Sequence, residues 1–130
     1  MNKIERFEDI IAWQKARVLT KEVYAMAGSG DFKRDFGLRD QIQRAAVSTM
    51  SNIAKGFERG GDKEFIQFLS HSKGSCGEVR SDLYVALDQG YITPVALNGL
   101  YERNVEVSRL VSGFMAYLQG SSLRGKKYRS

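Results

Sequence analysis

Residues 65 to 86 read FIQFLSHSKGSCGEVRSDLYVA, and this stretch decides the fold class. Its apolar and small residues recur at alternating steps of four and three, which is the spacing of one side of an α-helix that packs along a neighbour. The residues on this seam are Phe65, Leu69, Ser72, Cys76, Val79, Leu83 and Ala86. Gly90 follows as a helix stop, and Asp62 precedes the stretch as a plausible N-cap. The pattern predicts a long helix buried along one face.

The segments on either side show the same helical periodicity. Thr93-Pro94 favours a helix start, because threonine caps helices and proline is tolerated in their first turn. After it, the four-and-three spacing is repeated by Leu97, Leu100, Asn104, Val107, Val111, Phe114 and Leu118. Helical spacing also runs through residues 7 to 27 and 37 to 59, with a glycine-containing loop predicted at 28 to 35. For 37 to 59 the predicted inward face is Leu38, Ile42, Ala45, Ala46, Thr49, Ile53 and Phe57.

These four segments, joined by short turns, predict an all-α protein. No segment sustains the alternation typical of a strand, so we expect an antiparallel up-down-up-down four-helix bundle. A chain of 130 residues is one domain by the usual size of domains. We assign residues 1–120 to the bundle and 121–130 to a basic, flexible C-terminal tail.

The charge of the chain is concentrated in that tail. The net charge is +5, from 20 basic and 15 acidic residues. Residues 121–130 hold four cations and no acid, which leaves 16 basic against 15 acidic residues in the body, a net charge of +1. An argument for a polyanionic partner therefore depends on the tail or on a local surface.

Cysteine content and hydropathy indicate a cytoplasmic protein. The single cysteine cannot form an internal disulfide, and the first residues lack the apolar region of a secretory signal. No run approaches the roughly 20 apolar residues that span a bilayer, so we expect no membrane insertion.

Small residues are unusually frequent in two of the predicted helices. Residues 45 to 61 read AAVSTMSNIAKGFERGG, and the next helix contains Gly74 and Gly77. Glycine inside a helix costs about 1 kcal/mol relative to alanine, so a compensating contact is expected. One interpretation is close packing between these two helices. The other is a ligand or a partner helix that lies in the groove.

The sequence offers little for catalysis. The single histidine, His71, and the single cysteine, Cys76, are five residues apart and point in different directions on a helix. We read Cys76 as a buried core residue and His71 as an exposed polar one. One histidine and one cysteine cannot form a closed zinc site, and no Glu-x-x-His motif is present. We therefore expect no enzyme, no metal site and no cofactor.

Binding is the function class that the charges favour. One polar stripe on the segment 37 to 59 holds Gln41, Arg44, Ser48, Asn52, Lys55 and Arg59. Such a stripe can contact phosphates, and the alternative is an ordinary solvated face. The tail adds Arg124, Lys126, Lys127 and Arg129 around one aromatic ring. We predict that Arg44, Lys55, Arg59 and these tail cations bind nucleic acid.

Several motifs in their order resemble a bacterial protein family. They are FEDIIAWQKA at 7–16, FGLRDQIQRAA at 36–46, SNIAKG at 51–56, and FIQFL at 65–69 followed by Gly74, Ser75 and Glu78. Together they resemble the four-helix-bundle family of 23S rRNA intervening-sequence proteins. Relatives of that family include the accessory variability proteins of diversity-generating retroelements. The resemblance extends to about residue 118.

The resemblance implies a bundle that assembles as a homopentameric barrel without established enzymatic activity. It also implies that the retroelement relatives bind nucleic acid and a reverse transcriptase. One position departs from the family pattern, because Lys55 stands where the family usually has glutamate. This change would improve a contact with phosphate or alter a salt bridge between subunits.

Two functions follow from the sequence. The first is a non-enzymatic, oligomeric protein that binds RNA or DNA with low sequence specificity through basic surfaces. The second is a protein-interaction scaffold, or an accessory subunit of a reverse transcriptase in a diversity-generating retroelement.

Overall fold

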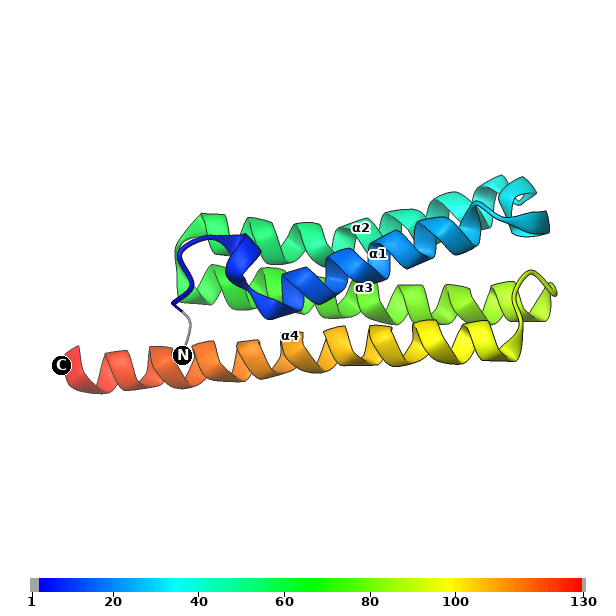
Figure 1. Ribbon diagram of the computed structural model, residues 1–130. Helices are drawn as coiled ribbons and strands as arrows, with labels where there is room; N and C mark the ends of the chain where they lie inside the picture. The colour runs from blue at the N-terminus through cyan, green and yellow to red at the C-terminus, as the bar shows by residue number, and fades with distance from the viewer. Residues whose placement is uncertain (1–2, 130) are drawn as a thin grey trace.

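The computed structural model describes the backbone of residues 3–129 and the side chains of residues 3–120. Its elements are η1 (Phe7–Asp9), α1 (Ile11–Ala27), η2 (Gly30–Arg34), α2 (Phe36–Arg59), α3 (Asp62–Asp88) and α4 (Pro94–Arg129), where η denotes a 3-10 helix. No strand occurs in this described part of the chain. The four α-helices lie antiparallel and side by side (Figure 1), and each packs on two neighbours, in the cyclic order α1, α2, α3, α4. The predicted four-helix bundle is consistent with this arrangement.

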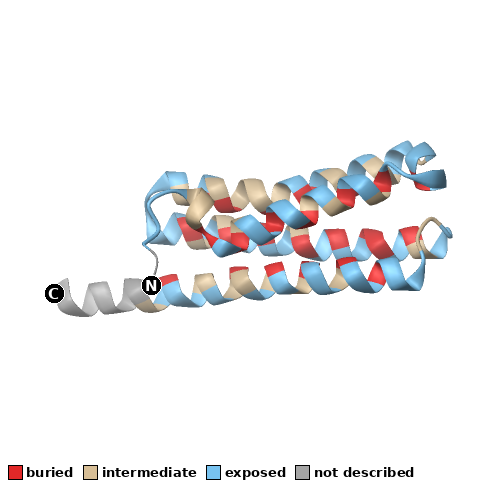
Figure 2. Cartoon of the chain, in the orientation of Figure 1, coloured by how far each residue is buried: buried red, intermediate tan, exposed pale blue. Residues whose placement is uncertain are grey.

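The core lies along the predicted seams. All seven seam residues of α3 are buried, and so are those of α4 except Phe114, which is half-buried. Figure 2 shows the buried positions recurring along the inner faces of the helices. Leu19 and Val23 of α1 and Ile42 and Ile53 of α2 complete the same core without measurable exposure. Burial of these side chains from water is the main stabilising contribution.

The helix ends confirm some capping predictions and correct one. Asp62 is the first residue of α3 rather than its N-cap, because the N-cap position is occupied by Gly61. In the first turn of α3 the negative charge of Asp62 lies near the positive end of the helix dipole, which is a stabilising arrangement. No side-chain hydrogen bond caps this end of the helix. The Oγ1 of Thr93 accepts a hydrogen bond from the Ala96 backbone N–H at 3.2 Å, as expected for a cap of α4. Gly90 has a φ of 76°, which only glycine adopts easily, just after α3 ends.

The N-terminal half differs from its prediction at two points. The predicted helix at 7–27 is interrupted at Ile10, whose φ of −77° and ψ of 120° separate η1 from α1. The predicted loop at 28–35 contains η2, and Phe32 of η2 is completely buried. η2 therefore extends the core beyond the end of α1, whereas η1 contains no buried residue.

The last helix extends beyond the predicted end of the bundle. The α4 backbone continues to Arg129, past the boundary placed at residue 120 (Figure 1). The side chains of Arg124, Lys126, Lys127 and Arg129 lie outside the described residues. Their role in binding stays a prediction.

Gly56 of α2 allows close helix packing, whereas Gly74 and Gly77 of α3 do not contribute to packing. A Cβ at Gly56 would lie 2.7 Å from Phe65 Cδ1 and 2.9 Å from Phe68 Cβ, so α2 and α3 approach closely only because this residue has no side chain. At Gly74 and Gly77 a Cβ would meet no heavy atom within 4 Å. Close packing therefore explains Gly56 and leaves these two α3 glycines without a packing reason inside the bundle.

Candidate nucleic-acid interface

The predicted polar stripe of α2 divides into two parts in the structure. Arg44 and Lys55 are exposed, and neither forms an ion pair with any described residue. They are eleven positions apart, which brings them to within about 20° of each other around the helix. The exposed carboxylate of Glu58 is the acidic group nearest to Lys55 in the α2 sequence, and it is not paired with Lys55. Arg44 and Lys55 therefore form the free basic part of the stripe.

Ser48 and Asn52 do not face outward as predicted. Both are half-buried at the contact between α2 and α3. The Ser75 hydroxyl donates to the Ser48 Oγ at 2.9 Å, and the Asn52 amide donates to the same oxygen at 3.0 Å. Helical periodicity placed these residues beside the cations, but the α2–α3 approach is close enough to bury short polar side chains there.

Arg59 lies at the C-terminal end of the same stripe. Its guanidinium carbon is 5.5 Å from the centroid of the Phe68 ring on α3. A cation over an aromatic face is held in place without losing its charge. Arg59 is therefore an exposed cation with a fixed position.

The residues considered for chemistry are placed as predicted. Cys76 is buried with 1 % exposure, and burial raises the pKa of its thiol to about 11. His71 is exposed on the same helix. A thiol that stays protonated in the core is a poor nucleophile.

A buried carboxylate in α3 was missed by the sequence reasoning. Asp82 is 3 % exposed, its Oδ1 accepts a hydrogen bond from the Gln41 amide at 2.8 Å, and its Oδ2 has no partner among the described residues. The pKa of Asp82 is raised to about 6, mainly because burial removes hydration and also because Glu78 is a nearby negative charge, while the Gln41 hydrogen bond opposes both effects. Its position beside the seam residue Leu83 is the one sequence signal of burial.

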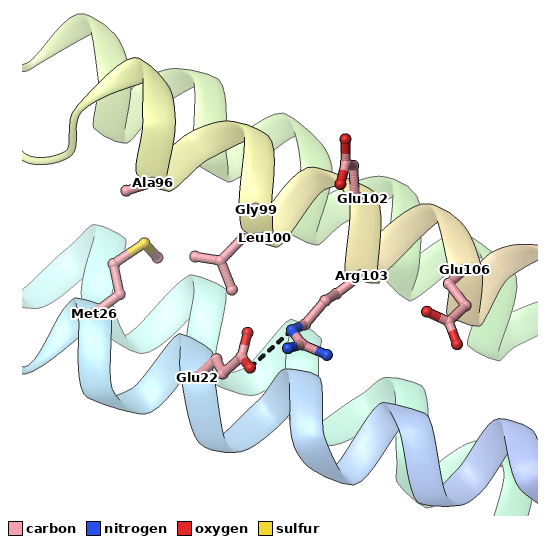
Figure 3. Close-up of a pocket in the computed structure, with 8 residues that line it drawn as sticks. All are labelled: Glu22, Met26, Ala96, Gly99, Leu100, Glu102, Arg103 and Glu106. Atoms are coloured by element: carbon pink, nitrogen blue, oxygen red, sulfur yellow. Dashed lines mark ion pairs between the residues drawn. The ribbon is translucent and has the colours of Figure 1, made fainter.

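The groove between α1 and α4 carries most of its charges in pairs. It is a cavity of about 590 Å³ in which Met26 and Leu100 lie beside charged side chains (Figure 3). The Arg103 Nε is 2.8 Å from Glu22 Oε1, as Figure 3 shows, and Lys15 Nζ is 3.5 Å from Glu106 Oε1. Half-exposed pairs of this kind join two helices and contribute little stability. This groove therefore presents compensated charge.

No group of three or more His, Cys, Asp or Glu side chains among the described residues is placed to hold a metal ion. None of the described helices has both the length and the apolar character to cross a membrane.

Comparisons with known proteins agree with the helical architecture. Residues 8–113 match the family model described as 23S rRNA-intervening sequence protein. A crystal structure from Bacteroides thetaiotaomicron, described as a protein with unknown function from the S23 ribosomal protein family, superposes with a TM-score of 0.73. The two sequences are 18 % identical, and the alignment covers 81 % of this chain and 98 % of the other, so the likeness shows a shared fold. Comparison with curated protein sequences found no match.

Proposed function

The chain belongs to the family of 23S rRNA-intervening sequence proteins, and from this premise we propose that it is a non-enzymatic protein that binds nucleic acid with low sequence specificity. The observation that supports the proposal is the pair of exposed cations on α2, Arg44 and Lys55, which have no ion-pair partner among the described residues. A cation without a partner is free to neutralise a phosphate and release its counterion.

Low specificity follows from the kind of groups on this surface. Lysine and arginine bind backbone phosphates in any sequence, whereas reading a base needs a shaped set of donors and acceptors. Between Arg44 and Lys55 lie the half-buried Ser48 and Ser51, and both hydroxyls are engaged in hydrogen bonds inside the protein. The α2 surface therefore offers charge without base recognition.

Fluorescence anisotropy with labelled RNA and DNA tests the proposal. We expect both to bind at low salt and the affinity to fall as salt rises, with a log-log slope of about 0.7 per phosphate contact on single strands. The variant Arg44→Gln/Lys55→Gln is expected to bind more weakly and to lower that slope by about 1.4.

The matched control is Lys21→Gln/Lys33→Gln, which removes the same charge from exposed positions in α1 and η2. We expect it to keep the wild-type slope. Absence of binding to RNA and DNA at low salt would disprove the proposed function. Equal slopes for the two double variants would show that the α2 cations do not contact phosphate.

We also propose that the protein is a homo-oligomer, a pentamer as the family resemblance implies. Ile11 and Val18 support this, because they lie one heptad apart on α1 and are 59 % and 41 % exposed. Light scattering is expected to give a mass of several chains for the wild type and a lower mass for Ile11→Gln/Val18→Gln. A wild-type mass of one chain, 14.6 kDa, would exclude the oligomer.

A further inference from the structure

A second basic surface lies between α3 and α4. A cavity of about 200 Å³ opens there. Lys73 and Arg80 of α3 line it together with Ser108 and Arg109 of α4, and none of the described lining residues is acidic. Three cations therefore line one small cavity whose described lining holds no carboxylate, although Glu102 and Glu106 lie with Arg109 around a separate groove.

These three cations are uncompensated. None of Lys73, Arg80 and Arg109 forms an ion pair within the described part of the chain. In the groove between α1 and α4, by contrast, Arg103 and Lys15 are both paired. Positive groups that share a cavity repel one another, and an anion bound between them relieves that repulsion. The electrostatics of the α3–α4 groove favour an anionic ligand.

Gly77 keeps this cavity open. It lies four residues after Lys73 and three before Arg80, so the three positions adjoin on one side of α3. A Cβ at Gly77 would meet nothing within 4 Å. Glycine lowers the stability of a helix relative to alanine, and no contact inside the bundle requires it here. Its effect on the molecule is to leave a gap between two cations.

The size of the cavity limits what enters it. A water molecule occupies about 30 Å³, so a cavity of about 200 Å³ holds a phosphate group with some of its water. Pockets that enclose whole small molecules have volumes of about 300 Å³ or more. The floor is fixed, because the Asn104 amide donates to the Cys76 carbonyl at 2.7 Å and Asn104 is 2 % exposed. A backbone phosphate fits this space, and the rest of the nucleotide has to lie outside it.

An exposed aromatic ring stands beside the cavity. Tyr84 follows Arg80 by one helical turn and is 48 % exposed. It contacts Tyr101 across the groove, with ring centroids 6.3 Å apart and an interplanar angle of 78°. The Arg80 guanidinium carbon is 5.7 Å from the Tyr101 centroid. Tyr101 therefore holds both neighbours in place, and Tyr84 offers a face on which a base can stack.

We propose that the α3–α4 groove binds single-stranded nucleic acid, with phosphates at Lys73, Arg80 and Arg109 and a base stacked on Tyr84. The inference rests on the proposed function and adds the place and the strandedness of the ligand. From Lys73 to Tyr84 the helix rises about 16 Å. A stacked strand advances about 3.4 Å per nucleotide, so the groove covers about five nucleotides.

The preference for a single strand over a duplex follows from the exposed ring of Tyr84. In a duplex the bases are paired and stacked on one another, so Tyr84 has no base to contact and only phosphate interactions remain. A single strand satisfies both the cations and the ring. We expect a short oligouridylate to bind more tightly than a DNA duplex of the same length.

Anisotropy with these two labelled probes tests the inference. Lys73→Gln/Arg109→Gln is expected to weaken oligouridylate binding several-fold and to lower the salt slope by about 1.4. The control Lys21→Gln/Lys33→Gln removes equal charge and is expected to bind as the wild type does. Tyr84→Ala is expected to abolish the preference for the single strand, and Tyr84→Phe to retain it because the ring remains.

A steric variant gives an independent readout. Gly77→Gln places a neutral side chain at the mouth of the cavity and is expected to weaken binding without a change of charge. Gly74→Gln adds the same side chain to α3 outside the cavity lining, and its binding is expected to be unchanged.

The outcomes separate the two proposals. If the wild type binds the oligouridylate but the groove variants bind equally well, the groove is not the site and the proposed function stands. A duplex that binds as tightly as the single strand overturns the stacking role of Tyr84. If the wild type binds neither probe at low salt, both proposals are wrong.

Discussion

Alanine at three glycines is expected to change stability in opposite directions. Gly56, Gly74 and Gly77 all lie inside helices, none with positive φ, so alanine improves helix propensity at each by about 1 kcal/mol. The surroundings differ. At Gly56 the new Cβ would be 2.7 Å from a Phe65 ring carbon and 2.9 Å from Phe68 Cβ, whereas at the other two positions it meets nothing within 4 Å.

The magnitudes follow from these two contributions. Gly74→Ala and Gly77→Ala are each expected to raise the free energy of unfolding by about 1 kcal/mol. For Gly56→Ala, overpacking of a filled core costs about 1 to 3 kcal/mol. The Phe65 ring can turn slightly, but Phe68 Cβ is fixed to the α3 backbone, so α3 has to move away from α2. After the gain in propensity, we expect a net loss of up to about 2 kcal/mol.

Urea unfolding followed by far-UV circular dichroism measures the three values. The propensity contribution is common to all three variants, so the difference between Gly56→Ala and Gly74→Ala isolates the packing cost. A Gly56→Ala variant as stable as Gly74→Ala would refute the close approach of α2 and α3. Destabilisation by Gly74→Ala or Gly77→Ala would refute the conclusion that no part of the bundle packs on these glycines.

Three further changes test polar groups that are buried or half-buried. Because burial raises the pKa of Asp82 to about 6, the folded protein binds more protons than the unfolded one between about pH 4 and 6, and this carboxylate lowers stability as pH rises through that window. Asp82→Asn is expected to remove that pH dependence and to raise stability at pH 7 by at most about 3 kcal/mol, measured by urea unfolding across pH. Tyr91→Phe removes the partly exposed hydrogen bond from the tyrosine hydroxyl to Asp35 Oδ2 at 3.0 Å, and is expected to lower the free energy of unfolding only slightly. Ser72→Ala removes a fully buried hydrogen bond to the Thr49 carbonyl at 2.7 Å, and a larger loss, of about 1 kcal/mol, is expected in the same assay.

The bundle itself was predictable because its core follows helical spacing. The seam of α3 was identified from the sequence alone, and each of its residues is buried. The helix ends were less predictable. Whether Gly61 or Asp62 is the N-cap depends on one pair of backbone dihedrals at the turn, and Gly61 has φ of −106° and ψ of 140°. Phe32 was placed in a loop because glycine and charge surround it, but its ring fills the end of the core.

The candidate surfaces were only partly predictable. Periodicity places Arg44 and Ser48 on one stripe, but the distance between α2 and α3 decides which of them is exposed, and that distance depends on Gly56. The α3–α4 groove was not predicted, since Lys73, Arg80 and Arg109 come from two helices. The antiparallel direction of α3 and α4 was predicted, but their meeting also depends on the register and rotation of the two helices, which no local pattern in the sequence specifies.

Gly56 and Gly77 show how one residue type serves two purposes in this bundle. Gly56 lies in the motif SNIAKG and packs on Phe65 and Phe68 of the motif FIQFL, so these two parts of the family resemblance meet as one contact between α2 and α3. The packing of α2 on α3 at Gly56 therefore compensates for the low helix propensity of glycine. At Gly77 the described residues supply no such offset, and the glycine instead opens a cavity between cations. If alanine at Gly77 stabilises the fold and a larger side chain there weakens nucleic-acid binding, stability and function oppose each other at this position, as expected where a site rather than the core determines the residue.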